Sequence, residues 1–271
     1  IILRHFGLKP KHTDLRDWQE KVVDKALYPK HKTSIAVVGK YIELQDAYKS
    51  IYEALRHGGI ANDAHVEIRK IDSEVIELDG PQKALEGVCG VLVPGGFGSR
   101  GIEGKIKAIQ YARENKIPFF GICLGMQCAA IEFARDCAGL AYANSTEFIK
   151  RAKDPVISLL EEQRKVKEMG ATMRLGAYPC QVAKGTIAYQ AYRKPLVFER
   201  HRHRYEFNNH YRNLFVKKGM IFSGINPDKH LVEILELKDH PWFVGVQFHP
   251  EFQSKPNKAH PLFRDFIKAS I

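Results

Sequence analysis

Short apolar runs alternate with amphipathic segments over the first half of the chain. Four of these runs predict strands, at residues 34–39, 65–71, 88–93 and 117–122. Three segments with apolar residues at helical spacing predict helices, at residues 46–57, 102–114 and 126–135. This alternation predicts an α/β fold with a mostly parallel sheet, helices on both faces and a functional site at the carboxyl edge.

The second half of the chain has a different pattern, because helical spacing becomes rare between about residues 140 and 235. Three strand-like runs joined by polar loops occupy residues 177–183, 215–225 and 231–237. They predict an antiparallel extension of the sheet. A last apolar run at 243–248 predicts another buried strand.

The first 32 residues differ from both halves, since they are rich in Lys, His and Asp and are interrupted by Pro10 and Pro29. We therefore expect a lead-in or interdomain linker at 1–32 and one domain at 33–271. The chain begins with Ile rather than Met, so we expect a piece of a longer polypeptide.

Cys123 lies between the predicted strand 117–122 and the predicted helix 126–135, with Gly121 and Gly125 on either side. A residue on such a tight strand-to-helix turn stands clear at the carboxyl edge of the sheet. The positive end of the helix dipole also favours a reactive thiolate. The alternative is a buried structural cysteine, and only partner residues can decide between the two.

Candidate partners follow the strand predicted at 243–248. In an extended segment His249 and Glu251 point the same way across Pro250, so the glutamate can orient the imidazole. An imidazole held in this way can serve a cysteine nucleophile as its acid and base. Alone, the same residues also fit a turn with a solvated glutamate.

The glycine-rich loop Pro94–Gly98 can bring backbone N–H groups to a ligand, and the amide of Leu124 can supply a second donor for an oxyanion. A phosphate-binding loop is the competing interpretation. The Gly-Lys-Ser/Thr ending of that motif is missing here.

Arginine and histidine alternate through residues 200–204, and an extended chain would place Arg200, Arg202 and Arg204 on one face. Such a face can grip an anion, line a nucleic-acid patch or simply be solvated. Glu147 offers a carboxylate for an ammonium group, although the surrounding residues 144–148 also fit a turn.

Composition narrows these options only slightly. The 271 residues are 44% hydrophobic and carry a formal charge of +11 that is spread along the chain, so it does not favour nucleic acid. No apolar stretch reaches the roughly 20 residues of a membrane helix. Five cysteines without a CxxC pair predict reduced thiols rather than a disulfide framework or metal site, in a cytoplasmic protein.

Taken together, these motifs resemble the glutaminase domain of CTP synthase, a class I (triad-type) glutamine amidotransferase with a flavodoxin-like sheet. Three motifs carry the class-level resemblance: PGGFG at 94–98, GICLGMQ at 121–127 and FHPEF at 248–252. Three more carry the narrower one: NSTEF at 144–148, TMRLG at 172–176 and ERHRHRYEFN at 199–208. The resemblance covers about residue 33 to the C-terminus, and residues 14–18 resemble the stretch that links the two halves of that enzyme.

The resemblance implies a role for each candidate residue. Cys123 would attack the side-chain amide of L-glutamine and form a thioester, with His249 and Glu251 completing the catalytic triad. The backbone amides of two residues would form the oxyanion hole: Gly96 and Leu124. Four side chains would hold or cover the substrate: Gln127, Glu147, Arg204 and Phe97.

The resemblance also implies partners. Ammonia would pass to a synthetase domain of the same polypeptide, absent from this chain, that aminates UTP to CTP with ATP and Mg²⁺ in pyrimidine biosynthesis. No cofactor is expected in this domain itself. GTP would be an activator of the whole enzyme, a ligase expected to form a homo-oligomer.

Two other functions remain open from the residues themselves. One is a γ-glutamyl hydrolase or peptidase on the same fold, which the basic segment 199–207 disfavours. The other is a basic binding module without catalysis, which the intact triad disfavours. The chain departs from the family at Ala171, where a second glycine is usual, and we expect a variable loop at 161–167.

Overall fold

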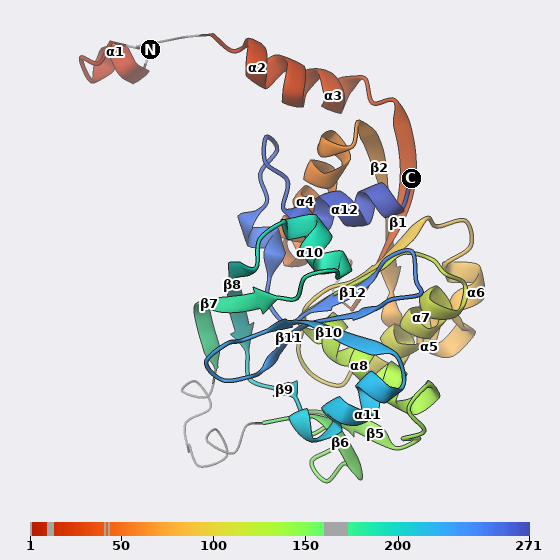
Figure 1. Cartoon of the computed structure of the whole chain (residues 1–271). Coiled ribbons are helices and arrows are strands. Elements are labelled where there is room, and N and C mark those ends of the chain that lie inside the picture. Colours follow the sequence, from red (N-terminus) through yellow and green to blue (C-terminus); the bar gives the residue numbers. More distant parts are fainter. Residues whose placement is uncertain (1, 10–13, 41, 43, 160–172) are drawn as a thin grey trace.

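The computed structural model describes residues 2–9, 14–40, 42, 44–159 and 173–271. Within them, nine strands form one sheet in the order β2-β1-β3-β4-β12-β11-β10-β7-β8 (Figure 1). Five of them form its parallel half: β1 (His31–Gly39), β2 (Ala64–Asp72), β3 (Gly90–Val93), β4 (Phe119–Ile122) and β12 (Phe243–Val246). The predicted parallel sheet is therefore confirmed.

Helices cover both faces of the parallel half. On one face, apolar side chains of α4 (Lys49–Ala61), α10 (Ile187–Tyr192) and α12 (Pro261–Ala269) form one core cluster. On the other face, α7 (Ile102–Glu114) and α8 (Leu124–Asp136) contribute to a second cluster. Shorter helical segments precede and flank these: η2 (Gln45–Tyr48), α5 (Ser73–Asp79) and α6 (Pro81–Ala84).

The predicted antiparallel extension is also present. It consists of β11 (Val232–Leu237), β10 (Met220–Ile225), β7 (Arg174–Val182) and β8 (Leu196–His203). A second, small sheet joins β5 (Ala143–Ser145), β6 (Asp154–Ser158) and β9 (Glu206–Phe207). This small sheet packs near α8, so it lies on the nucleophile side of the molecule.

One predicted element is wrong in part. Residues 215–225 do not form a single strand, because α11 (Arg212–Lys217) occupies the start of that range and β10 only the end. Phe215 is fully buried against Phe133 and Phe207. The apolar run therefore reports burial, which a helix meets as well as a strand.

The segment that precedes the sheet is partly helical rather than irregular. It carries four short segments: α1 (Ile2–His5), α2 (Arg16–Trp18), η1 (Gln19–Val23) and α3 (Asp24–Leu27). In Figure 1 these helices extend away from the sheet. The boundary expected at residue 32 stays a prediction, and the loop expected at 161–167 and Ala171 lie outside the described residues.

Candidate active site

Cys123 is on a strained turn between β4 and α8. Its φ of 52° lies in the left-handed region, which is rare for a residue with a side chain and is typical of functional sites. Its backbone N–H donates to the carbonyl of Val246 on β12 at 2.7 Å, which fixes the turn to the neighbouring strand. The thiol is buried, with 4% of the residue exposed.

The flanking glycines are required by close packing. A Cβ on Gly125 would lie 2.0 Å from the carbonyl oxygen of Val93, and a Cβ on Gly121 would lie 2.8 Å from the backbone of Gly125. Helix α8 can therefore approach β3 and β4 closely only because both residues lack a side chain. This approach places the start of α8, with Cys123 at its N-cap, at the carboxyl edge of the sheet.

His249 follows β12, which pairs in parallel with β4, so the imidazole and the thiol meet at one edge of the sheet. The His249 side chain hydrogen-bonds to Cys123, and its Nδ1 lies 2.8 Å from Oε1 of Glu251. Burial opposes a charged imidazole, but the negative charges and hydrogen bonds of Cys123 and Glu251 outweigh it. Together they raise the pKa of His249 to about 10.

His249 and Glu251 meet as predicted, but the predicted backbone between them is wrong. Residues Pro250–Gln253 form a 3-10 turn, η5, rather than an extended segment. The turn brings the carboxylate back toward the imidazole ring, as the 2.8 Å contact requires. The predicted pair is thus in contact, although through a different backbone conformation.

The loop Pro94–Gly98 lies against the same groups. A Cβ on Gly95 would sit 3.0 Å from Cε1 of His249, and one on Gly96 would sit 3.3 Å from Cδ2 of Leu124. The backbone at Gly96 and the first residue of α8 are therefore neighbours. N–H groups in the first turn of a helix have no partner within the helix, so this arrangement suits the predicted pair of oxyanion donors.

A narrow pocket of about 30 Å³ opens beside the thiol. Eight residues line it: Gly96, Phe97, Cys123, Gln127, Glu147, His203, Arg204 and Tyr205. It brings together all four side chains predicted to hold or cover a substrate. His203 and Tyr205 lie in the basic motif noted in the sequence, but the sequence did not assign them to the site.

Glu147 and Phe97 are tied together through the glycine-rich loop. Oε1 of Glu147 accepts from the N–H of Gly98 at 2.9 Å, and the ammonium group of Lys40 donates to the carbonyl of Phe97. Burial raises the pKa of Glu147, while the bond from Gly98 and the charges of Lys40 and Arg204 oppose that rise. The loop is thus held from both sides of one peptide unit.

Gln127 and Arg204 face this pocket with different hydrogen-bonding capacity. Nε2 of Gln127 donates to the carbonyl of Tyr205 at 3.0 Å and to Oε1 of Gln247 at 3.2 Å. Its Oε1 is therefore the atom suited to accept from a ligand. Nε of Arg204 is buried and has no hydrogen-bond partner among the described residues.

The basic motif contributes more to the interior than to the surface. Along β8 the predicted alternation exposes Arg200 and Arg202, while His201 and His203 are buried. The strand ends at His203, so Arg204 leaves the exposed face and reaches the pocket. The expectation of three arginines on one face is therefore wrong for the third.

A buried ion network lies behind this wall of the pocket. Arg174, from the TMRLG motif, pairs with Glu206 at 3.0 Å and with Glu233 at 2.8 Å. Each carboxylate also contacts a histidine, Glu233 with His201 at 2.6 Å and Glu206 with His203 at 2.8 Å. Four strands are joined in this way, and two of the family-like motifs meet in one structural network.

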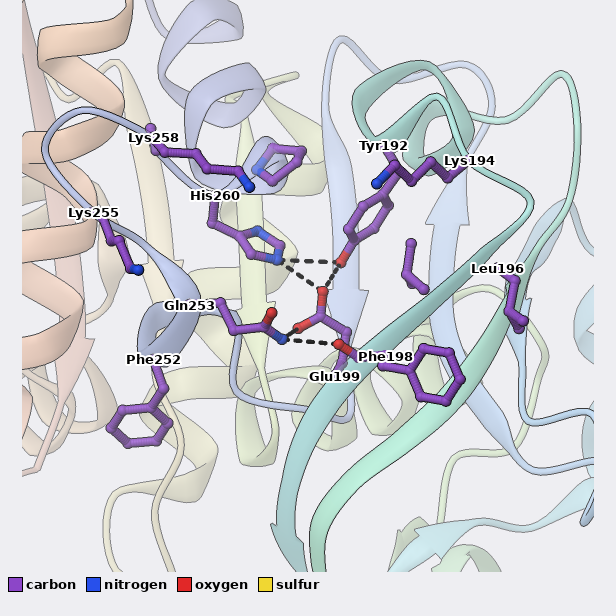
Figure 2. Close-up of a pocket in the computed structure, with 13 residues that line it drawn as sticks. Tyr192, Lys194, Leu196, Phe198, Glu199, Phe252, Gln253, Lys255, Lys258 and His260 are labelled. Carbon is purple, nitrogen blue, oxygen red and sulfur yellow. Dashed lines mark hydrogen bonds and ion pairs between the residues drawn. The ribbon is translucent and has the colours of Figure 1, made fainter.

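A larger pocket, about 540 Å³, lies on the other side of the triad turn (Figure 2). In its floor, Glu199 accepts from Tyr192 at 2.7 Å and from Gln253 at 2.7 Å, and contacts His260 at 2.9 Å. Figure 2 shows these four side chains converging on one another. The network anchors η5, which carries Glu251, to β8 and to the start of α12.

Gln247 is the contact of the thiol that sequence reasoning missed. It is fully buried, and its Nε2 donates to Sγ of Cys123 at 3.8 Å. Its position two residues before His249 was a usable signal, since alternate residues of a strand share a face. Within the described part of the chain, no group of three or more His, Cys, Asp or Glu side chains is placed to hold a metal ion.

The structure also has no helix, among the residues it describes, that is long and apolar enough to span a membrane. This agrees with the expectation that the chain lacks a membrane segment.

Comparisons with known proteins agree with this geometry. The family model described as glutamine amidotransferase class-I matches residues 43–269. CTP synthase of Ruminiclostridium cellulolyticum is 58% identical over 270 residues, which are 100% of this chain and 50% of that protein. CTP synthase of Carboxydothermus hydrogenoformans is 56% identical over 271 residues, again 100% of this chain and 50% of that protein. The chain spans about half the length of the curated relatives that it matches.

Solved structures lead to the same group. The glutaminase domain of Trypanosoma brucei CTPS, determined with bound acivicin, is 39% identical with a TM-score of 0.82, covering 88% of this chain and 93% of that one. A GMP synthase protein of Thermoplasma acidophilum shares the fold at 16% identity and a TM-score of 0.55, over 89% and 94% of the two chains. The chain belongs to the class-I glutamine amidotransferase family and, within it, to the CTP synthase glutaminase domains.

Proposed function

We propose that this chain hydrolyses L-glutamine to glutamate and ammonia, with Cys123 as the nucleophile. The observation that carries the proposal is the contact of the buried thiol with His249, which is itself paired with Glu251 at 2.8 Å. The same thiol lines a pocket with an acidic and a basic side chain, Glu147 and Arg204. An α-amino acid presents the complementary ammonium and carboxylate groups.

The reaction proceeds in two steps. The Cys123 sulfur attacks the side-chain amide carbon, forming a C–S bond, and the C–N bond breaks as the proton on His249 passes to the leaving ammonia. Neutral His249 then takes a proton from water, whose oxygen attacks the thioester and releases glutamate and the sulfur. The amides of Gly96 and Leu124 stabilise the oxyanion in both steps.

Substrate recognition divides among the remaining pocket residues. Glu147 and Oε1 of Gln127 accept from the α-ammonium group, and Arg204 binds the α-carboxylate through its unpaired guanidinium edge. The pocket, at about 30 Å³, is smaller than a glutamine molecule. We propose that the loop carrying Phe97 moves outward to admit the substrate, which its glycines allow, and then covers it.

We further propose that the ammonia serves CTP synthesis in the whole protein. The support is the CTP synthase name of relatives at 56% to 58% identity, whose length is about twice that of this chain. A synthetase domain using ATP and Mg²⁺, activation by GTP and assembly into a homo-oligomer belong to this proposal. So does a cytoplasmic location, which free cysteines support.

Cys123→Ala tests the nucleophile. Glutaminase turnover and covalent labelling by a glutamine-like electrophile should both be lost. Cys128→Ala is the matched control, because that thiol lies in the same helix but burial raises its pKa to about 12, so it should be inert. Retained activity in Cys123→Ala, or a preference for γ-glutamyl peptides over free glutamine, would contradict the proposal.

A further inference from the structure

Gln247 occupies the space between the nucleophile and the pocket wall. It follows β12 directly, and none of its surface is exposed. Its backbone N–H donates to the carbonyl of Glu233 on β11 at 2.9 Å, so the residue is fixed to the sheet from both sides. A buried amide with both ends in use is a rigid element of a site.

The direction of the Gln247 amide is set by a chain of hydrogen bonds. The carbonyl of Tyr205 can only accept, so Gln127 presents Nε2 to it at 3.0 Å. The second hydrogen of that Nε2 goes to Oε1 of Gln247 at 3.2 Å. Gln247 must then present its own Nε2 to the sulfur of Cys123, at 3.8 Å.

We propose that Gln247 is a positioning residue that holds the Cys123 sulfur as a thiolate aimed into the pocket. This proposal rests on the proposed glutaminase function. A neutral N–H donor favours the charged form of a sulfur acceptor without itself exchanging protons. His249 and Gln247 thus contact one sulfur, and only His249 takes part in proton transfer.

The amide chain also links recognition to chemistry. Gln127, Tyr205 and the adjacent Arg204 all line the pocket, whereas Gln247 contacts the nucleophile. A substrate that orders the pocket wall therefore also orders the donor on the sulfur. The charged and titratable groups around this sulfur are His249 with Glu251 behind it, and three in the pocket lining: Glu147, His203 and Arg204.

Three variants separate positioning from bulk packing. Gln247→Met keeps a similar length but removes the donor, and Gln247→Glu keeps the shape but places a like charge beside the thiolate. Gln247→Asn keeps an amide that is one methylene too short, and it carries the test if the methionine variant fails to fold. Gln181→Glu, an exposed glutamine on β7, controls for the added charge.

The measurement is the pH dependence of alkylation by iodoacetamide, followed for each thiol by peptide mass spectrometry. Exposed Cys89 is an internal reference in every variant. The alkylation midpoint of Cys123 should rise by about one pH unit in Gln247→Met and Gln247→Asn, and by about two in Gln247→Glu. The midpoints of Cys89, and of Cys123 in Gln181→Glu, should not move.

Glutaminase kinetics give the second readout. In Gln247→Met, kcat/KM at pH 6 should fall about tenfold and recover as the pH passes the alkylation midpoint, with KM within about twofold of wild type. A raised KM with an unchanged alkylation midpoint would overturn the proposal and make Gln247 a packing residue. If wild type lacked glutaminase activity, the proposed function would fail, while the alkylation midpoints would still judge Gln247.

Discussion

The two halves of the large sheet place active-site residues by different physical means. In the parallel half, strands β3, β4 and β12 are fully buried and consist only of apolar residues and glycine. The antiparallel half encloses buried charges and histidines: Arg174, Glu199, His201, His203, Glu206, Glu233 and Glu236. Apolar packing therefore positions the nucleophile, whereas directional polar contacts position the opposite wall of the pocket.

This division matches what each side has to do. The turn at Cys123 needs a close backbone approach, which glycine and tight apolar packing provide without directional bonds. Arg204 must instead present a charge at one point, and the ion pairs of Arg174 fix the strand end before it. A pocket that joins both halves should therefore respond differently to damage on either side.

Removing Arg174 should have the largest effect on this comparison. Arg174→Met leaves Glu206 and Glu233 buried without their cation, so we expect unfolding free energy to fall by about 4 kcal/mol. Urea denaturation measures that loss. Where the protein still folds, the KM for glutamine should rise more than kcat falls, because the wall next to Arg204 is loosened while Cys123 stays in place.

A combined variant sharpens this result. Arg174→Met with Glu206→Gln and Glu233→Gln removes the buried charges together, so it should recover part of the lost stability. If the triple variant is no more stable than Arg174→Met alone, unpaired charge is not the cause. A fall in kcat at constant KM would mean that the network supports the nucleophile side instead.

The same contrast explains how far sequence could predict the molecule. The strands and helices of the parallel half have strong local signals, and helix α7 begins and ends where its periodicity predicts, at Ile102 and Glu114. The strand predicted at 215–225 failed because Phe215 is buried on a helix. The buried network was also missed, since its pairs join residues 32 and 59 positions apart.

For the site, the motifs predicted which residues meet but not how. His249 and Glu251 are close because of a 3-10 turn, which a Pro-Glu pair permits but does not require. The role of Gln247 depends on which way an amide faces. Only the contacts with Gln127 and Tyr205, distant in sequence, determine that direction.

Removing the Glu251 charge tests the nucleophile side with a smaller effect on stability. Glu251→Gln should lower kcat about 100-fold, because a neutral amide orients and charges the imidazole less well. Burial lowers the pKa of His249, and the charges on Cys123 and Glu251 raise it to about 10. Losing one of these charges should therefore move the alkaline limb of the rate profile to lower pH.

The same raised pKa has a consequence for stability. A histidine whose pKa rises from 6.5 to about 10 on folding stabilises the protein fully below pH 6.5, and this contribution is lost as the pH rises through 10. Glu251→Gln should thus destabilise the protein more at pH 6 than at pH 10.5. Equal losses of unfolding free energy at both values would contradict this assignment.

The smallest expected effect is at Gln253, where the antiparallel half supports the triad turn from behind (Figure 2). Its Nε2 donates to Glu199 at 2.7 Å and to the carbonyl of Phe198 at 2.9 Å, but the side chain is exposed. Gln253→Leu should cost about 1 kcal/mol of unfolding free energy.

Because this bond anchors η5, kcat should fall about threefold in Gln253→Leu, with KM for glutamine unchanged. Gln190→Leu, at another exposed glutamine, is the control and should leave kcat unchanged. If Gln253→Leu instead raised KM alone, the turn that carries Glu251 would belong to the pocket wall. The separation of the two halves would then end at β12.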